Sequence, residues 1–274
     1  MKFKKYAYPY LIWLFIFIIA PLFLVFCYSL KIGRVEYFTF VFYKKFFQLK
    51  YMKILFASAK IAFYATGICL LLGYPFAYII SKAKAKRRNV MILLVIIPMW
   101  MNFLLRTYAW IGILNRNGFL NNILRIFGLG RVNLLYTKYA VLIGMVYNFL
   151  PFMVLPIYSV LEKMDESLIE ASKDLGATSF QTFLKVIFPL SIPGIVTGVI
   201  MVFIPAISTF EIASLLGGNK YNLIGNVIEQ QFKFTGEWNF GSAMSIVLMM
   251  IILISIVITN KFGESEEKGG GTLW

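Results

Sequence analysis

The sequence predicts an all-α integral membrane protein with six transmembrane helices, and three observations support this prediction. Hydrophobic residues make up 60% of the 274 residues and charged residues only 14%, against about 45–50% and about 25% in an average soluble domain. The charges are unevenly spread, and several uncharged runs reach the roughly 20 residues that a helix needs to cross a bilayer core. A water-soluble fold is excluded, because too few polar residues remain to cover its surface.

Each expected span is an uncharged run or the extension of one. The first begins after the basic sequence MKFKK, and its apolar part is longer than the roughly 7 to 15 residues of a signal-peptide core, so we expect an uncleaved helix. The third has only 17 uncharged residues before Arg106, and we expect it to continue past this arginine to Leu114. The six expected spans are residues 6–30, 61–81, 89–114, 139–161, 186–210 and 238–260.

Basic residues indicate the orientation of the chain. The net charge is +15, and in so apolar a chain we assign the excess to span ends near lipid head groups rather than to nucleic-acid binding. The expected segments on the two sides of the membrane hold nearly equal numbers of basic residues. However, residues 82–88, KAKAKRR, place five of them in the short segment between the second and third spans. A dense basic loop is typical of the cytoplasmic side, so we expect both termini in the cytoplasm.

Several classes of chemistry are disfavoured by what the sequence lacks. There is no histidine, and the two cysteines, Cys27 and Cys69, lie in apolar runs where we expect them to be packing residues. No phosphate-binding G-x4-G-K-[ST] sequence occurs. We therefore expect no catalytic residue, no metal and no cofactor bound by this chain, and we disfavour a membrane-embedded enzyme. An ion-coupled secondary transporter, which would use intramembrane carboxylates or histidines, is a further alternative.

The segment between the fourth and fifth spans, residues 162–190, is unlike the rest of the chain because it holds five of the twelve acidic residues. The sequences SLIE from Ser167 and TSFQ from Thr178 each match a capping box, and Gly176 lies between them. Glycine after a helix supplies the left-handed conformation that ends it. The segment is therefore predicted to form two short helices joined by a glycine turn.

One face of the first short helix is apolar. Leu168, Ala171 and Leu175 follow one another at spacings of three and four residues, which places them together on a helix. Such a face indicates either a docking surface for a partner or a loop that folds back on the ends of the protein's own spans.

The same segment resembles the loop signature of importer-type ABC permeases, E-A-A-x3-G-x9-I-x-L-P. Glu170-Ala171-Ser172, Gly176 and the sequence VIFP ending at Pro189 match it at every spacing, with mild departures at Ser172, Val186 and Phe188. The resemblance implies the ABC importer type I permease architecture. It also implies an ATPase-coupling loop in residues 162–190, built around Ser167, Leu168, Glu170, Ala171, Ser172, Leu175, Gly176 and Pro189.

Other sequences narrow the resemblance to permeases of spermidine/putrescine importers, among them PMWMNFLLRTYAW from Pro98. It implies polyamine transport across a bacterial cytoplasmic membrane, with another small cationic or organic solute as the alternative. It also implies the partners: a second permease subunit in a heterodimer, two ABC ATPase subunits that use ATP and magnesium on the cytoplasmic side, an extracytoplasmic substrate-binding protein and the lipid bilayer.

The expected domain plan follows from these segments. Residues 1–53 would form the first transmembrane helix and an outer loop, residues 54–260 the permease core, and residues 261–274 a cytoplasmic tail.

Glu211 is the candidate residue for the solute path. It follows the 25-residue uncharged run 186–210, and a carboxylate at membrane depth usually faces a cavity. Alternatively the fifth span ends near Thr209 and Glu211 faces outer water. Aromatic side chains can bind cations through their faces, although many line membrane interfaces. The aromatic candidates for the path are Trp100, Tyr108, Trp110 and Tyr147.

Overall fold

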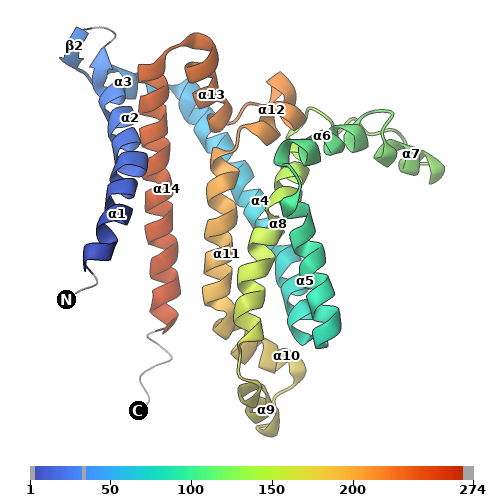
Figure 1. Cartoon of the computed structure of the whole chain (residues 1–274). Helices are drawn as coiled ribbons and strands as arrows, with labels where there is room; N and C mark the ends of the chain where they lie inside the picture. Colours follow the sequence, from blue (N-terminus) through green and yellow to red (C-terminus); the bar gives the residue numbers. More distant parts are fainter. Residues whose placement is uncertain (1–3, 33–34, 268–274) are drawn as a thin grey trace.

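The structure, a computed structural model, describes residues 4–32 and 35–267, and these are helical nearly throughout (Figure 1). Within the described ranges, five helical segments are long and apolar enough to cross a membrane, or six if one bent pair counts as a span. This confirms the predicted all-α, multi-span fold. The five segments are Pro9–Leu30, Leu49–Lys82, Lys138–Glu162, Ser179–Ser208 and Trp238–Thr259.

The first span is one continuous helical rod that includes a π-helical turn. A two-stranded antiparallel ribbon follows it, in which Lys31 lies opposite Phe38 and Ile32 lies opposite Val35. The elements are α1 (Lys4–Leu14), η1 (Phe15–Ile19), α2 (Ala20–Leu30), β1 (Lys31–Ile32), β2 (Val35–Phe38) and α3 (Val41–Phe46). Among the described helices, α2 packs mainly against the last helix, α14 (Trp238–Glu267).

Three helices form the centre of the bundle: α4 (Leu49–Lys82), α8 (Lys138–Glu162) and α11 (Phe188–Ser208). Each packs against the other two (Figure 1). Their buried faces carry small residues, as is usual where membrane helices approach closely. The predicted span 139–161 coincides with α8 to within one residue at each end.

Met153 of α8 shows how close these helices come. It is fully buried. A Cβ built on Gly73 of α4 would lie 3.0 Å from its Cγ, and one built on Gly198 of α11 would lie 2.7 Å from its Sδ. Both glycines thus leave room for one methionine between three helices.

The third span differs from the prediction. We expected one helix over residues 89–114, but the chain breaks after α5 (Ala85–Trp100) and turns by 96° into the pair α6 (Phe103–Leu114) and α7 (Phe119–Ile126). Asn102 causes the new start, because its side-chain oxygen accepts hydrogen bonds from the amides of Leu104 and Leu105 at 2.9 and 3.3 Å. Arg106 therefore lies on a transverse helix and not inside a straight span.

The remaining elements complete the bundle. They are α12 (Glu211–Gly217), η3 (Gly218–Lys220), α13 (Ile224–Gln230), η4 (Gln231–Thr235) and α14. The predicted tail, 261–274, is helical as far as Glu267, and residues 268–274 lie outside the described part of the chain. The expected domain boundary after residue 53 falls inside α4, which begins at Leu49.

The start of α1 and the end of α14 point toward the same end of the bundle as the turn between α4 and α5 and the segment between α8 and α11 (Figure 1). We call this the loop end. The helices α6, α7, α12 and α13 lie at the opposite end, which we call the far end (Figure 1). A chain that crosses the membrane an even number of times begins and ends on the same side, as this arrangement does. The arrangement also brings the basic sequence 82–88 beside the acidic loop.

Candidate functional site

The segment between α8 and α11 contains two short helices, as predicted. The first is α9 (Glu166–Asp174), and its cap differs from the expected one. Asp165, not Ser167, is the N-cap, since its Oδ1 accepts a hydrogen bond from the Ser167 amide at 2.9 Å. This hydrogen bond lowers the pKa of the Asp165 carboxyl from its ordinary value. The predicted capping box SLIE is therefore wrong, because the helix begins one residue before Ser167.

The end of α9 confirms the glycine turn. Gly176 has φ +82°, and a Cβ at this position would meet nothing within 4 Å. The Gly176 amide donates to the Lys173 carbonyl at 2.8 Å, and the Ala177 amide donates to the Ser172 carbonyl at 3.1 Å. These two bonds are a Schellman motif. The position requires glycine for its backbone conformation and not for space.

The second short helix, α10 (Ser179–Thr182), begins with the predicted capping box. The Thr178 amide donates to Gln181 Oε1 at 2.9 Å, and the Gln181 amide donates to Thr178 Oγ1 at 3.3 Å. A π-helical turn, η2 (Phe183–Ile187), then leads into α11, where Pro189 occupies the first turn.

The predicted apolar face of α9 is open to solvent. Leu175 is 89% exposed and Leu168 46% exposed, and Ala171 and Glu170 are also exposed. The loop therefore does not fold this face back onto the ends of the described spans. The helix α9 lies at the tip of the molecule (Figure 1).

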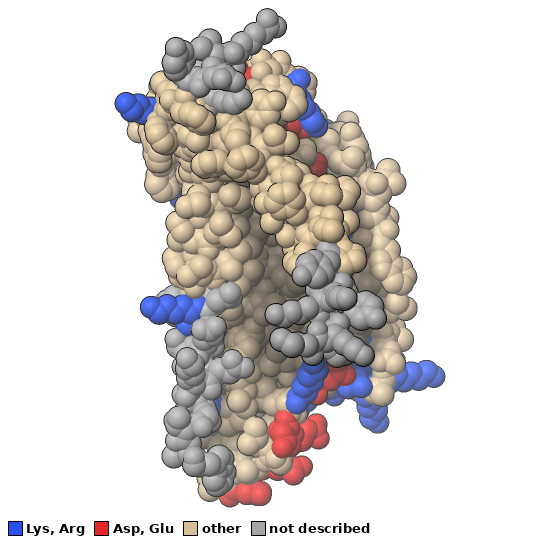
Figure 2. Space-filling model, turned by 60° about the vertical axis from the view of Figure 1, so that its left-hand side comes forward, with Lys and Arg blue, Asp and Glu red and all other residues tan. Residues whose placement is uncertain are grey.

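Polar contacts link the segment internally and to the basic sequence 82–88. Ser172 Oγ lies 3.0 Å from Thr182 Oγ1, which joins α9 to α10. Arg88 Nη1 lies 3.2 Å from Glu162 Oε1, and Lys82 Nζ lies 3.9 Å from Glu166 Oε1. Figure 2 shows acidic side chains gathered at this end with basic side chains beside them. The basic sequence 82–88 is thus a partner of the acidic loop.

An aromatic cluster, which the sequence analysis missed, ties the segment to α4. The ring of Phe183 lies 5.8 Å from the rings of Tyr74 and of Tyr78, in edge-to-face contacts. The Tyr74 hydroxyl lies 3.0 Å from Ser191 Oγ of α11. Tyr74 and Tyr78 are four residues apart, and this spacing is the signal that would have indicated an aromatic face. A displacement of α9 and α10 would act on both α4 and α11.

Glu211 lies at the far end, at the first position of α12. The fifth span ends at Ser208, and the Glu211 side chain is half-buried. It lines a cavity of about 300 Å³ together with Phe103 of α6 and Phe149 of α8. Glu211 is therefore beyond the end of the span, yet it lines a recess between helices.

The four aromatic candidates are divided by the structure. Trp110 and Tyr147 meet edge to face, with ring centroids 5.3 Å apart, and join α6 to α8. Trp100 is 77% exposed and Tyr108 56% exposed. Two of the four aromatic candidates, Trp110 and Tyr147, thus contact each other in the described structure.

Arg106 is the unexpected feature of this region. It is only 8% exposed, and its Nε and Nη1 have no hydrogen-bond partner within the described residues. Its Cζ lies 5.9 Å from the ring of Phe103, the residue that shares the cavity with Glu211. A buried charge needs partners for its hydrogen-bond donors, so the burial of Arg106 is a feature that the sequence did not reveal.

No group of three His, Cys, Asp or Glu side chains among the described residues could hold a metal ion. Cys69 is buried, Cys27 is half-buried, and both are free thiols.

Comparison with known proteins identifies the family of the chain. Residues 70–262 match the family described as binding-protein-dependent transport system inner membrane component. The spermidine/putrescine transport system permease protein PotB of Haemophilus influenzae is 41% identical over 253 residues, or 90% of this chain and 88% of that protein. PotB of Escherichia coli K12 is 42% identical over 210 residues, or 76% of each chain.

A solved structure with a similar fold is a bacterial ABC transporter involved in the import of the acidic polysaccharide alginate. Its TM-score is 0.77 at 19% identity, with 96% of each chain covered. At this identity, the likeness concerns the fold alone.

Proposed function

We propose that this chain, which belongs to the family of binding-protein-dependent transport system inner membrane components, imports polyamines such as spermidine and putrescine as part of an ATP-driven ABC importer. The chain is a transport subunit and a multi-pass membrane protein of that family. The observation that supports the solute is the 41% identity to PotB of H. influenzae over most of both chains. Another small cationic or organic solute is the second candidate.

The energy for transport would come from separate ATPase subunits, because the chain contains no phosphate-binding loop of its own. We expect ATP and magnesium to be used there. The exposed face of α9, formed by Leu168, Ala171 and Leu175, would be the docking surface for one such subunit. Acidic residues around it would supply charge complementarity.

The contacts of the loop support a route from this docking surface to the spans. A force on α9 would reach α10 through the Ser172–Thr182 hydrogen bond. From there it would reach α4 through Phe183, and α11 through the continuous helix Ser179–Ser208, of which α10 is the start. Rigid-body displacement of packed helices is a common way to switch a protein between two states. Access would alternate between the two sides of the membrane as these helices rock.

The remaining partners follow from the family. A second, similar permease subunit would complete the heterodimer, and a substrate-binding protein would deliver the solute at the far end. We propose a bacterial cytoplasmic membrane with the loop end and both termini in the cytoplasm. The five basic residues of KAKAKRR at the loop end support this orientation.

Glu211 is our candidate for the solute path at the far end. Its carboxylate lines the recess between α6, α8 and the end of α11, and would replace part of the water that an ammonium group loses on entry. The edge-to-face pair of Trp110 and Tyr147, which does not line this recess, would present aromatic surface elsewhere along the path. Trp100 and Tyr108 are more exposed and suit contacts with lipid or a partner chain.

The test is uptake by the reconstituted importer. The chain, its second permease and its ATPase subunits are placed in vesicles, with the binding protein and labelled spermidine on one side and ATP on the other. We expect uptake that requires ATP and persists when an ionophore abolishes the proton gradient. Uptake that follows the proton gradient would favour a secondary transporter. ATP-dependent uptake of a different solute, with none of spermidine, would retain the permease and reject the polyamine assignment.

A further inference from the structure

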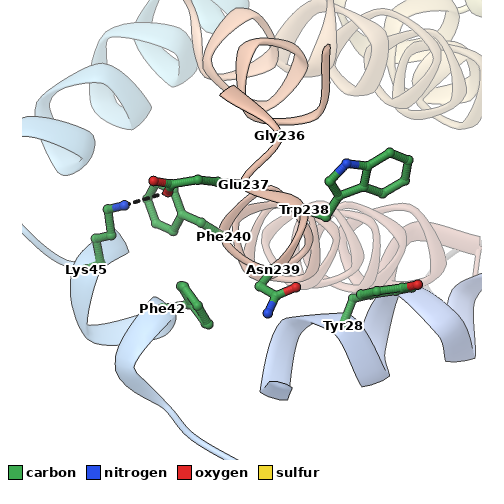
Figure 3. Close-up of a pocket in the computed structure, with 8 residues that line it drawn as sticks. All are labelled: Tyr28, Phe42, Lys45, Gly236, Glu237, Trp238, Asn239 and Phe240. Carbon is green, nitrogen blue, oxygen red and sulfur yellow. Dashed lines mark hydrogen bonds and ion pairs between the residues drawn. The ribbon is translucent and has the colours of Figure 1, made fainter. Parts of the chain in front are cut away.

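A second recess lies at the far end, between α2, α3 and the start of α14 (Figure 3). It has a volume of about 660 Å³, within the roughly 300–1,000 Å³ of small-ligand sites. Its lining combines four aromatic side chains, Tyr28, Phe42, Trp238 and Phe240, with the charged pair Lys45 and Glu237. These residues are separate from the solute-path candidates.

The charged pair is well formed but still open to a ligand. Lys45 Nζ lies 2.7 Å from Glu237 Oε2, and 4.3 Å from the centroid of the Phe240 ring. The two side chains are 36% and 49% exposed. An ammonium has three donors and a carboxylate has about four acceptor positions. Each partner can therefore bind a further group without breaking the ion pair.

The opposite side of the recess is aromatic. The rings of Tyr28 and Trp238 lie 6.5 Å apart, and Figure 3 shows both on the side away from Lys45. Their faces suit an organic ammonium group or the glycerol region of a lipid.

The height of the recess along the bundle indicates the class of ligand. Tyr28 lies two residues before the end of the apolar segment Pro9–Leu30, and Trp238 is the first residue of Trp238–Thr259. The recess is thus at the level where two spans meet the polar surface, which is the level of lipid head groups. Beside it, α3 is flanked by the exposed side chains of Phe40 and Phe47, which are 67% and 62% exposed, as in a helix that lies in the interface.

We propose that this recess binds the head group of a zwitterionic phospholipid that carries both a phosphate and a primary ammonium, as phosphatidylethanolamine does. Lys45 donates to the phosphate, and Glu237 accepts from the ammonium. The ion pair is neutral overall, so an anionic lipid would meet the Glu237 carboxylate and a free polyamine would meet the Lys45 ammonium. Only a ligand with both charges satisfies both residues.

The bound lipid would fasten the first span to the bundle. Among the described helices, α2 packs mainly on α14, and it is linked to α3 by the hydrogen-bonded pair Ser29 and Tyr43, 2.8 Å apart. The recess borders all three elements. The site is independent of the solute, so the proposal does not depend on polyamine transport.

Native mass spectrometry of the purified importer tests the proposal. The complex is stripped of lipid and titrated with phosphatidylethanolamine, phosphatidylglycerol of the same acyl chains, or spermidine. We expect preferential retention of phosphatidylethanolamine by the wild-type protein. Lys45→Gln and Glu237→Gln should each weaken this retention about five- to tenfold, since each removes a charge-assisted contact.

A matched ion pair outside the recess provides the control. Lys233 Nζ lies 2.8 Å from Glu229 Oε1 at the same end, so Lys233→Gln and Glu229→Gln should leave retention unchanged. Equal retention of the two lipids by the wild type would overturn the proposal without reference to any variant. Displacement of phosphatidylethanolamine by spermidine, lost in Glu237→Gln, would identify the recess as a cation site instead.

Discussion

Replacing Gly176 with alanine isolates the backbone conformation at the end of α9. The residue has φ +82°, and the added Cβ meets no atom within 4 Å, so the substitution changes conformational preference without creating a clash. Holding a non-glycine residue in the left-handed region costs about 1–2 kcal/mol. If the proposed ATPase docks on α9 only when this turn is formed, its dissociation constant should rise about 5- to 30-fold.

The assay is retention of the ATPase subunit by the tagged chain at limiting ATPase concentration, together with solute-stimulated ATP hydrolysis. Gly128 supplies a matched control. It has φ +72° and open space around it. Its amide donates to the Arg125 carbonyl and the next amide donates to the Leu124 carbonyl, so it ends α7 with the same motif at the far end. Gly128→Ala should carry the same local cost and leave ATPase binding unchanged.

Two results would refute the reasoning. Wild-type ATPase affinity in Gly176→Ala would show that the turn does not position the docking surface. An equal loss in Gly128→Ala would show a general loss of stability and not a local effect. Gly176→Val should weaken binding more than the alanine variant does, because a β-branched residue tolerates the left-handed region less well.

Four further predictions concern other parts of the chain. Glu211→Gln should reduce spermidine uptake with assembly and basal ATPase activity intact, and uptake equal to that of the wild type would remove this residue from the path. Arg106→Met should raise the midpoint of thermal unfolding of the isolated chain, since a buried charge with two nitrogens lacking partners among the described residues is replaced by an apolar side chain; a lower midpoint would show that the guanidinium is satisfied by a group not seen among the described residues. In a background lacking Cys27 and Cys69, an impermeant thiol reagent applied to intact cells should label Asn122→Cys at the far end but not Lys84→Cys at the loop end, and the reverse pattern would invert the proposed orientation. The hydrogen bond that lowers the pKa of Asp165 stabilises the folded chain at pH values above the ordinary carboxyl pKa, and this stability is lost as the pH falls through the lowered pKa. The NMR signal of the Ser167 amide should therefore titrate below the ordinary aspartate range. Titration within that range would argue against the cap.

Local sequence signals predicted most of the helices and the glycine turn. The span 139–161 was located to within a residue of α8, because a long uncharged run has only one way to satisfy its backbone in a membrane. Gly176 and the Thr178 capping box were found for a similar reason: the hydrogen bonds that they make lie within a few residues of sequence.

Two local predictions were wrong where neighbouring signals compete. Asp165 and Ser167 are both good N-cap residues, and the sequence does not say which of them starts α9. The expected straight span through Arg106 overlooked Asn102, whose side chain caps a new helix and so favours a break. Pro98 precedes this break by a few residues, in the last turn of α5, and was a second signal of the same boundary.

The sequence by itself determined the class of protein, the approximate positions of most apolar spans and the loop that resembles a coupling helix, since composition, run length and short-range caps are properties of contiguous residues. Only the tertiary structure decided which side chains meet across long distances in the chain. It pairs Lys45 with Glu237, 192 positions apart, places the basic sequence 82–88 against Glu162 and Glu166, and gives Glu211 a recess shared with α6 and α8. These contacts depend on how helices pack and where they bend, and the residue pattern within one helix does not specify which other helices pack against it.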